Sequence, residues 1–351
     1  MSIIFYQFIF LSGVLSLMIT QSISRFKWLP KLTLFIIMIF LSIIIGMRGE
    51  NVGNDTSEYY SIFYRLIYSG PNSYVYVHID YLFRELNLII HKIGEGPELV
   101  ILIGTILSIF PYYFFFKRYS SCYWISFASF LSLGSFFFIH SGLRQSIACG
   151  ILLLSYRFVE EKRWFLFLLS VLAAMGFHLS AFFALVYIIS RLEVNWKLLV
   201  VFYLPSILAY VKPDLIHSIF SLILFIAPEK YAKYILSTNE ITRSGLGIKA
   251  LMMYFFGFFF IYAYSKSNNS KDKAIYVIAI FSIGFANFFV NFSAISRLGL
   301  YLIPFVCLSF SLLYTQCIYK KDKIFVGYLL FVLFMVFYLR QSFNDSYGIF
   351  Y

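Results

Sequence analysis

The sequence predicts an all-α integral membrane protein that crosses the bilayer about a dozen times and has no separate soluble domain. Apolar residues make up 61% of the chain and charged residues only 13%, whereas soluble domains contain about 45–50% and 25% respectively. Apolar runs also follow one another along most of the sequence, and basic residues gather in the short segments between them. This alternation is typical of a polytopic membrane protein.

The expected helices are apolar runs that approach the roughly 20 residues needed to cross a bilayer, although several are shorter. The run at 164–192 could form one long tilted helix or two short ones. Taken as two, the expected helices lie at residues 3–19, 32–47, 98–116, 122–139, 143–159, 164–177, 179–192, 196–211, 250–265, 274–291, 298–316 and 324–340.

The basic residues predict how these helices are oriented. No basic residue precedes residues 3–19, which indicates a first helix with its N-terminus outside and not a signal peptide. Every second connecting segment carries at least two basic residues, and such segments face the cytoplasm, so both termini are expected outside. A single helix at 164–192 would move the later basic segments outside, which favours two helices meeting near His178. The basic segments contain Arg25, Lys27 and Lys31; Lys117 and Arg118; Lys162 and Arg163; Arg191 and Lys197; Lys266, Lys271 and Lys273; and Lys320, Lys321 and Lys323.

We expect residues 1–351 to form one transmembrane domain with two longer external segments, at about 48–97 and 212–249. The run 216–227 in the second segment is too short to span and ends at Pro228, which indicates an interfacial or re-entrant helix.

The charge and the cysteines argue against two other classes of protein. A net charge of +12 would suit a nucleic-acid binder, but about half of the basic residues lie in the short segments that orient membrane helices. The four cysteines lie inside or at the ends of apolar runs without metal-ligand spacing. We therefore expect no nucleic-acid partner, no metal and no disulfide framework.

Two arginines stand between apolar runs and are candidate substrate contacts. Arg144 and Arg297 would be expensive to bury unless they face a polar cavity. Asn287 and Asn291 lie four residues apart and share a helix face near Arg297. Arginine presents a planar fork that binds phosphate or carboxylate. The alternative for other external arginines is snorkelling to lipid head groups; these are Arg65, Arg84 and Arg340.

Two further residues could act as a general base. His178 lies at the proposed outer turn between two short helices, and its imidazole titrates near neutral pH. Its alternative role is a hydrogen bond to a helix end. Asp55 precedes a helix expected to begin at Thr56, so it could cap that helix or act as a carboxylate base.

The segment Arg48-Gly-Glu-Asn-Val-Gly-Asn-Asp55-Thr56-Ser-Glu-Tyr59 resembles the R-x-x-x-V-G-x-D-T-x-x-Y stretch of the EpsG family of Wzy-like polysaccharide polymerases. The resemblance extends over residues 45–301. Further motifs follow in the family's order: R-Q-x-I-A at Arg144, F-H-x-S-A at Phe177, a tyrosine and glycine segment at 230–247, and R-x-x-x-Y from Arg297 to Tyr301. One departure is Asp80-Tyr81, where the family often has a glutamate before an aromatic residue.

This resemblance implies a GT-C-like enzyme in the bacterial inner membrane that needs no nucleotide sugar, cofactor or metal. Such enzymes move a growing glycan from undecaprenyl pyrophosphate to the non-reducing end of the next lipid-linked repeat unit, on the outer face. Its partners would be that lipid-linked oligosaccharide, membrane lipid, and a flippase and chain-length regulator. The expected catalytic residues are His178, Asp55, Arg144 and Arg297. The expected substrate contacts are Arg48, Arg243, Asn291, Asp80 and Tyr301.

Three alternative functions stay open. An O-antigen ligase would use the same donor with a lipid A-core acceptor, although the motif order favours the polymerase. A transporter or flippase of lipid-linked glycans would place polar residues near the bilayer midplane and often shows inverted repeats. A structural membrane scaffold would not need arginines at the membrane boundary.

Overall fold

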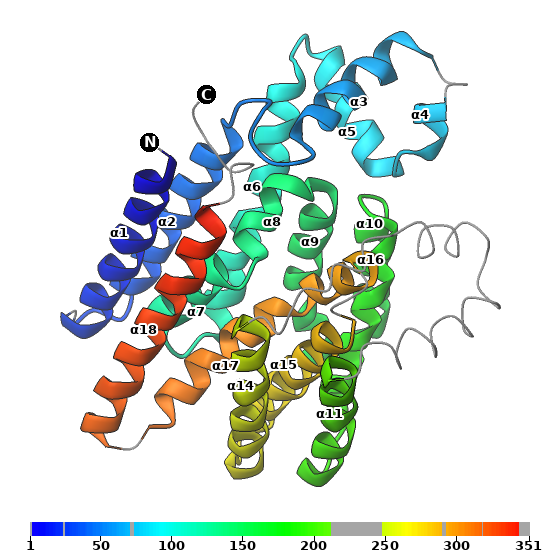
Figure 1. The fold of residues 1–351 in the computed structure, drawn as a ribbon. Helices are drawn as coiled ribbons and strands as arrows, with labels where there is room; N and C mark the ends of the chain where they lie inside the picture. Colours follow the sequence, from blue (N-terminus) through cyan, green and yellow to red (C-terminus); the bar gives the residue numbers. More distant parts are fainter. Residues whose placement is uncertain are drawn as a thin grey trace. The chain divides into compact units, whose positions relative to one another are not determined.

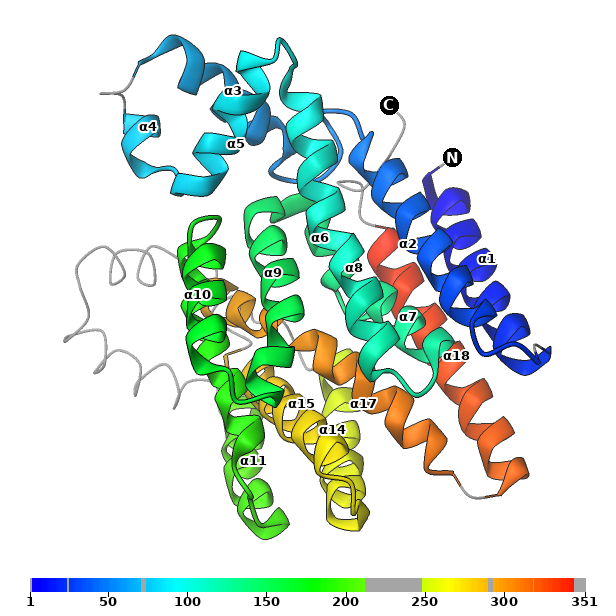
Figure 2. The same cartoon turned by 180° about the vertical axis from the view of Figure 1, so that it is seen from behind.

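The computed structural model describes residues 2–23, 25–70, 74–211, 248–289, 293–317 and 319–343, and every regular element in these ranges is a helix. Figures 1 and 2 show these helices, and the chain divides into two compact units. The first, unit 1, contains residues 1–185 and 310–351, and the second, unit 2, contains residues 186–309. The second external segment expected from the sequence, including the run 216–227, lies almost entirely outside the described residues.

Unit 1 is a helical bundle. Its helices α2, α6, α9 and α10 pack against one another in that order, while α1, α7 and α18 pack together (Figure 2). The bounds are α1 Ser2–Ile23, α2 Leu29–Gly46, α6 Pro97–Tyr119, α7 Tyr123–Ser132, α8 Ser135–Ser141, α9 Leu143–Glu160, α10 Trp164–Met175 and α18 Lys320–Ser342.

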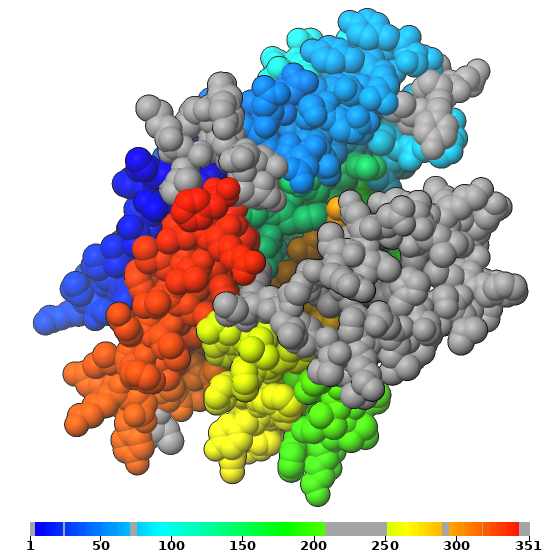
Figure 3. Space-filling model, in the orientation of Figure 1, coloured from blue at the N-terminus to red at the C-terminus, as the bar shows by residue number. Residues whose placement is uncertain are grey.

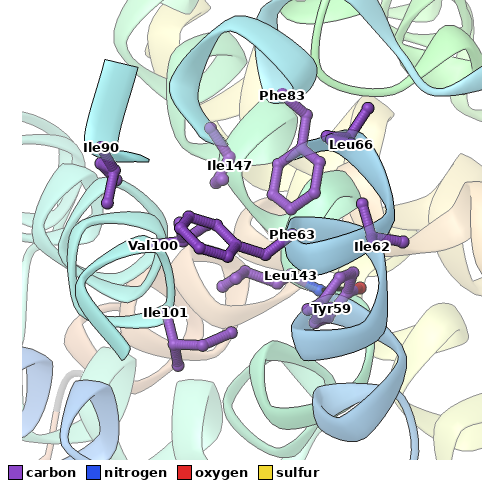
Figure 4. Close-up of a cluster of buried hydrophobic side chains, with 10 residues drawn as sticks. All are labelled: Tyr59, Ile62, Phe63, Leu66, Phe83, Ile90, Val100, Ile101, Leu143 and Ile147. Carbon is purple, nitrogen blue, oxygen red and sulfur yellow. Dashed lines mark hydrogen bonds between the residues drawn. The ribbon is translucent and has the colours of Figure 1, made fainter. Parts of the chain in front are cut away.

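The segment expected at about 48–97 contains three short helices, which lie at one end of this bundle (Figures 1 and 3). They are α3 Thr56–Tyr68, α4 Tyr74–His78 and α5 Tyr81–Lys92. The buried residues of α3 recur at helical spacing, which gives the helix one apolar face. That face joins side chains of α5, α6 and α9 in one apolar cluster (Figure 4): Tyr59, Ile62, Phe63, Leu66, Phe83, Ile90, Val100, Ile101, Leu143 and Ile147. The external segment is therefore built onto the bundle.

The helix expected at 122–139 is broken in the structure. α7 ends at Ser132 and α8 begins at Ser135, with a bend of 44° between them. Gly134 makes the bend possible because its φ of 113° is left-handed, a conformation that costs other residues more. The chain breaks again at Gly142, between α8 and α9. Arg144 consequently lies in the first turn of α9.

The expected pair of helices around His178 is present in a modified form. α10 ends at Met175, and a 3₁₀ helix, η1, covers Leu179–Arg191. Because a 3₁₀ helix rises about 2.0 Å per residue, these 13 residues extend over about 26 Å, against about 20 Å in an α-helix. That length approaches the roughly 30 Å of a bilayer core, so the stretched winding compensates for a short sequence.

Only part of the expected span count is supported. Within the described ranges, four helices are long and apolar enough to cross a membrane, or five if α7 and α8 form one broken span. The shorter apolar helices lie at Trp164–Met175, Leu179–Arg191, Trp196–Ile207 and Ile303–Thr315. The structure thus supports an α-helical membrane protein. The remaining spans of the expected dozen fall on segments that are short, bent or charged.

Unit 2 contains three helices that pack on one another, α11 Trp196–Val211, α14 Ile248–Lys266 and α15 Ser270–Phe288. Tyr203 of α11 packs against Gly257 of α14, and its hydroxyl donates to the carbonyl of Tyr254 at 3.1 Å. Residues of α11 and α15 line a largely apolar cavity of about 840 Å³. The remaining elements are α16 Ser293–Ser296, η2 Arg297–Tyr301 and the part of α17 Ile303–Thr315 that precedes residue 310.

Gly53, in the connection between α2 and α3, provides a test of how closely this connection contacts α8. Its φ is 88°, and a Cβ there would overlap the carbonyl oxygen of His140. Gly94 has a φ of 84° but open space around it. Gly94→Ala should lower the free energy of unfolding by about 1–2 kcal/mol because of the left-handed backbone alone. We expect Gly53→Ala to lower it by several kcal/mol more, because the backbone there must also move. Thermal unfolding of the two detergent-purified variants would measure this, and equal melting temperatures would disprove the contact.

Candidate functional site

The centre of the candidate site is an ion pair between Arg144 and Asp80. Arg144 Nη1 donates to Asp80 Oδ2 at 2.7 Å, and the two side chains are 28% and 17% exposed. Asp80 immediately precedes α5, and Arg144 is the second residue of α9. The Arg144 guanidinium carbon also lies 5.9 Å from the centroid of the Phe83 ring. The structure thus brings together two residues that lie 64 positions apart in the sequence, and it leaves both side chains partly exposed.

Arg144 has hydrogen-bonding capacity that this pair does not use. A guanidinium carries five N–H donors in a planar fork, and within the described part of the chain its buried Nε has no hydrogen-bond partner. A buried donor without a partner costs about 1–3 kcal/mol. Arginine binds phosphate and carboxylate oxygens through this fork, and the side chain of Arg144 is partly exposed, so an oxyanion can approach it.

His178 is held by the residue two positions further along. Its Nδ1 accepts a hydrogen bond from the backbone N–H of Ser180 at 3.3 Å and lies 2.6 Å from the Ser180 hydroxyl oxygen. If Nδ1 accepts this N–H, a neutral ring carries its proton on Nε2, and Nε2 is then a hydrogen-bond donor suited to an anion. If Nδ1 instead donates to the Ser180 hydroxyl, Nε2 can accept a proton, so His178 stays a candidate base.

A backbone hydrogen bond joins the segment that carries Asp80 to the segment that carries His178. The N–H of Leu82 donates to the carbonyl of Gly176 at 2.7 Å. Asp80 lies two residues before Leu82, and His178 lies two residues after Gly176. The contact requires glycine, because a Cβ at residue 176 would lie 2.6 Å from Leu82 Cγ. The ends of α5 and α10 therefore bring both segments to one region of unit 1.

Arg48, expected among the substrate contacts, is instead directed into the protein. Its side chain is 3% exposed. Its fork donates to Thr105 Oγ1 at 2.9 Å, to the Ile45 carbonyl at 3.1 Å and to Thr56 Oγ1 at 3.3 Å. Burial lowers the pKa of Arg48 to about 10, an effect that nearby Tyr59 opposes. These contacts make Arg48 a structural link between α2, α3 and α6, because its donors are taken up inside the unit.

Asp55 does not form the capping bond that was its alternative role. It occupies the N-cap position of α3, yet its side chain makes no capping hydrogen bond. Its charge acts on Tyr59: burial raises the pKa of Tyr59, Arg144 opposes that rise, and Asp55 adds to it. Asp55 thus belongs to the same neighbourhood as Tyr59 and Arg144 and stays a candidate base.

The remaining candidates fall in unit 2 or outside the described residues. Arg297 begins η2 and is exposed. The side chain of Tyr301, an expected substrate contact, is 0% exposed, and its carbonyl accepts the Tyr187 hydroxyl at 2.7 Å. The side chain of Tyr301 therefore lies buried among neighbouring residues, where the sequence suggested a substrate contact. Asn287 is buried, and its Nδ2 has no partner within the described ranges. Arg243 and Asn291 lie outside those ranges.

Some residues of the site were not singled out from the sequence. Thr56 and Tyr59 belong to the quoted motif, so their place in it was a usable signal. Phe83 lies beneath Arg144, and no sequence pattern indicated it. In the part of the chain that is described, no group of three or more His, Cys, Asp or Glu side chains could hold a metal ion.

Substituting Arg48 tests its structural role. Arg48→Lys keeps the charge but loses the fork that bonds Thr56 and Thr105. Because buried hydrogen bonds to a charged group contribute about 1.5–3 kcal/mol each, the purified protein should melt several degrees lower. Arg65→Lys is the matched control, since Arg65 forms an exposed ion pair with Glu58. An Arg48→Lys protein with native melting but weakened substrate binding would return Arg48 to the substrate contacts.

Comparison with known proteins yields one match. The family model for the EpsG family matches residues 31–351. No curated protein and no solved structure matches the chain. Because the match covers nearly all of the sequence, including the segments that carry Arg48, Asp80, Arg144 and His178, this chain belongs to the EpsG family.

Proposed function

We propose that this protein is a Wzy-type polysaccharide polymerase of the bacterial inner membrane. It would transfer a growing glycan from undecaprenyl pyrophosphate to the non-reducing end of the next lipid-linked repeat unit. The observation that carries this proposal is the partly exposed Arg144–Asp80 pair, whose arginine has a buried donor without a partner in the described structure. In a membrane protein of the EpsG family, such an arginine suits the pyrophosphate of a lipid carrier.

The proposed reaction is a glycosyl transfer. The acceptor hydroxyl oxygen forms a bond to the anomeric carbon of the donor glycan, while the bond from that carbon to the pyrophosphate oxygen breaks. The lipid pyrophosphate leaves with the electron pair, and Asp55 takes the hydroxyl proton. Arg144 and the Nε2–H of His178 stabilise the charge that grows on the leaving group, and fixed donors of this kind are often the largest catalytic contribution.

The helix ends support the proposed orientation. Arg118, at the end of α6, pairs with Glu160 at the end of α9, with 2.9 Å between Nη2 and Oε2. Two of the expected cytoplasmic segments therefore meet at one end of these helices. Arg144 is at the other end of α9, and 18 residues of α-helix extend about 27 Å. The pair with Asp80 would thus face the outer side, within a GT-C-like fold of about twelve spans whose termini are both periplasmic.

Arg144 provides the direct test of this function in cells that lack the chromosomal copy. A polymerase without its leaving-group contact should lose about 100-fold or more in rate. We expect Arg144→Ala to leave single repeat units on the lipopolysaccharide core, or an equivalent short capsule product, while the protein is still present in the membrane. Arg65→Gln, a matched loss of an external arginine, should give normal ladders.

Other banding patterns would contradict the proposal. A normal ladder from Arg144→Ala would disprove the site. Loss of all capped core from a deletion strain would indicate a ligase. Repeat units stranded on the cytoplasmic side would indicate a flippase.

Two substitutions of His178 separate a hydrogen-bond donor from a base. Gln can place an N–H near the position of the imidazole Nε2, whereas Ala cannot. If His178 donates to the leaving group, His178→Gln should keep activity within about tenfold of native, while His178→Ala loses about 100-fold. The rate should also keep its dependence on pH in His178→Gln. A Gln variant as inactive as Ala, together with loss of a pH limb near neutrality, would make His178 the base.

A further inference from the structure

The junction between α8 and α9 leaves backbone groups that need partners. α8 ends at Ser141 and α9 begins at Leu143, and a helix end leaves its last carbonyls and first N–H groups without bonds inside the helix. Such groups are costly in apolar surroundings. Gly142, at the N-cap position of α9, has no side chain to cap it. A Cβ at that position would overlap the Phe138 ring, so residue 142 cannot supply a cap of its own.

The hydroxyl of Tyr59, from α3, satisfies both sides of this junction. It donates to the carbonyl of Ser141 at 3.0 Å and accepts from the N–H of Leu143 at 2.9 Å. The side chain of an N-cap residue normally accepts an N–H of the first helical turn, at the second or third helical residue, from within the same helix. Tyr59 accepts an N–H of that turn from a helix more than 80 residues away in sequence, with a separation of 84 to Leu143.

The ring of Tyr59 is tied to Arg144 as well. It is 4% exposed and packs edge-on against Phe83, with 5.6 Å between the centroids (Figure 4). The Arg144 guanidinium lies over that same Phe83 ring. Tyr59 therefore holds the backbone that precedes Arg144 and also the ring beneath its side chain.

The residues around Tyr59 strengthen the same junction. Thr56 Oγ1 lies 3.2 Å from the carbonyl oxygen of His140, and the N–H of Asn54 donates to the Ser141 hydroxyl at 3.2 Å. Arg48 Nη2 donates to the Ile139 carbonyl at 3.5 Å. Successive residues at the end of α8 are thus bonded by the connection between α2 and α3.

We infer that Tyr59 is a positioning residue that caps α9 from α3 and thereby directs Arg144 toward the leaving pyrophosphate. This inference rests on the proposed function of Arg144. Without the hydroxyl, Ser141 and Leu143 lose their partner, the first turn of α9 loosens, and the Arg144 fork loses its fixed direction. Tyr59 itself does not touch the reacting atoms.

Tyr59→Phe tests this inference because it keeps the ring and removes only the hydroxyl. The assay uses the purified full chain with a lipid-pyrophosphate-linked repeat unit. A small displacement of a catalytic group can cost up to about 100-fold in rate, and we expect a loss of roughly tenfold or more in kcat. Tyr64→Phe is the matched control on the same helix. Tyr64 is 47% exposed and stacks on Tyr68, so its variant should be native.

A double-mutant cycle with Arg144→Lys distinguishes positioning from general stability. If Tyr59 acts through Arg144, Tyr59→Phe should lower the rate much less in the Arg144→Lys protein than in the native protein, because interacting residues give non-additive effects. Equal losses in the two backgrounds would overturn the inference. So would native activity of Tyr59→Phe, or its failure to fold, which would assign the hydroxyl to folding alone.

The same measurements separate this inference from the proposed function. An inactive Arg144→Ala with a fully active Tyr59→Phe would leave the polymerase site standing and remove only the role of Tyr59. A fully active Arg144→Ala would remove the site itself.

Discussion

The hydrogen bonding of the α8–α9 junction is the constraint on which the site in unit 1 depends. Leu143 is buried and Ser141 and Gly142 are only partly exposed, so the carbonyls and N–H groups at this break depend largely on partners within the protein. The segment between α2 and α6 supplies these partners: Tyr59 bonds Ser141 and Leu143, Thr56 approaches His140, and Arg48 reaches Ile139. The family motif that carries these residues thus has a physical reason that does not require any of the three to touch a substrate.

The hydrogen bonds at that junction also determine where the charged side chains of the site lie. Arg144 is the second residue of a helix whose first N–H is bonded by Tyr59, and Asp80 Oδ2 accepts a hydrogen bond from the Arg144 guanidinium at 2.7 Å. The backbone bond between Leu82 and Gly176 brings the His178 segment to the same region. Packing at one end of unit 1 therefore gathers an arginine, a carboxylate and a histidine from α9, the start of α5 and the end of α10. Such a group can bind an anion and move a proton.

The sequence predicted the helical membrane class, the break near His178 and the family, because composition, loop charge and ordered motifs record these properties directly. It also named Arg144, Asp80, Asp55 and His178. It could not predict that Arg48 and Tyr301 are buried. An arginine or tyrosine at a helix end has the same sequence pattern whether its side chain faces the substrate or a neighbouring carbonyl. The bend at Gly134 and the 3₁₀ winding of η1 were missed since both depend on tertiary packing, which hydropathy does not encode. Phe83 supports Arg144 from a helix that no motif marks.

The central claim is that this chain uses a lipid pyrophosphate as its leaving group. The most direct measurement follows the purified full chain in lipid nanodiscs, supplied with a lipid-pyrophosphate-linked repeat unit as its sole glycan. We expect glycans of two or more repeats that stay attached to carrier lipid, with one lipid pyrophosphate released for each new glycosidic bond. Folded protein that lengthens no glycan, or that lengthens it without releasing lipid pyrophosphate, would contradict the account.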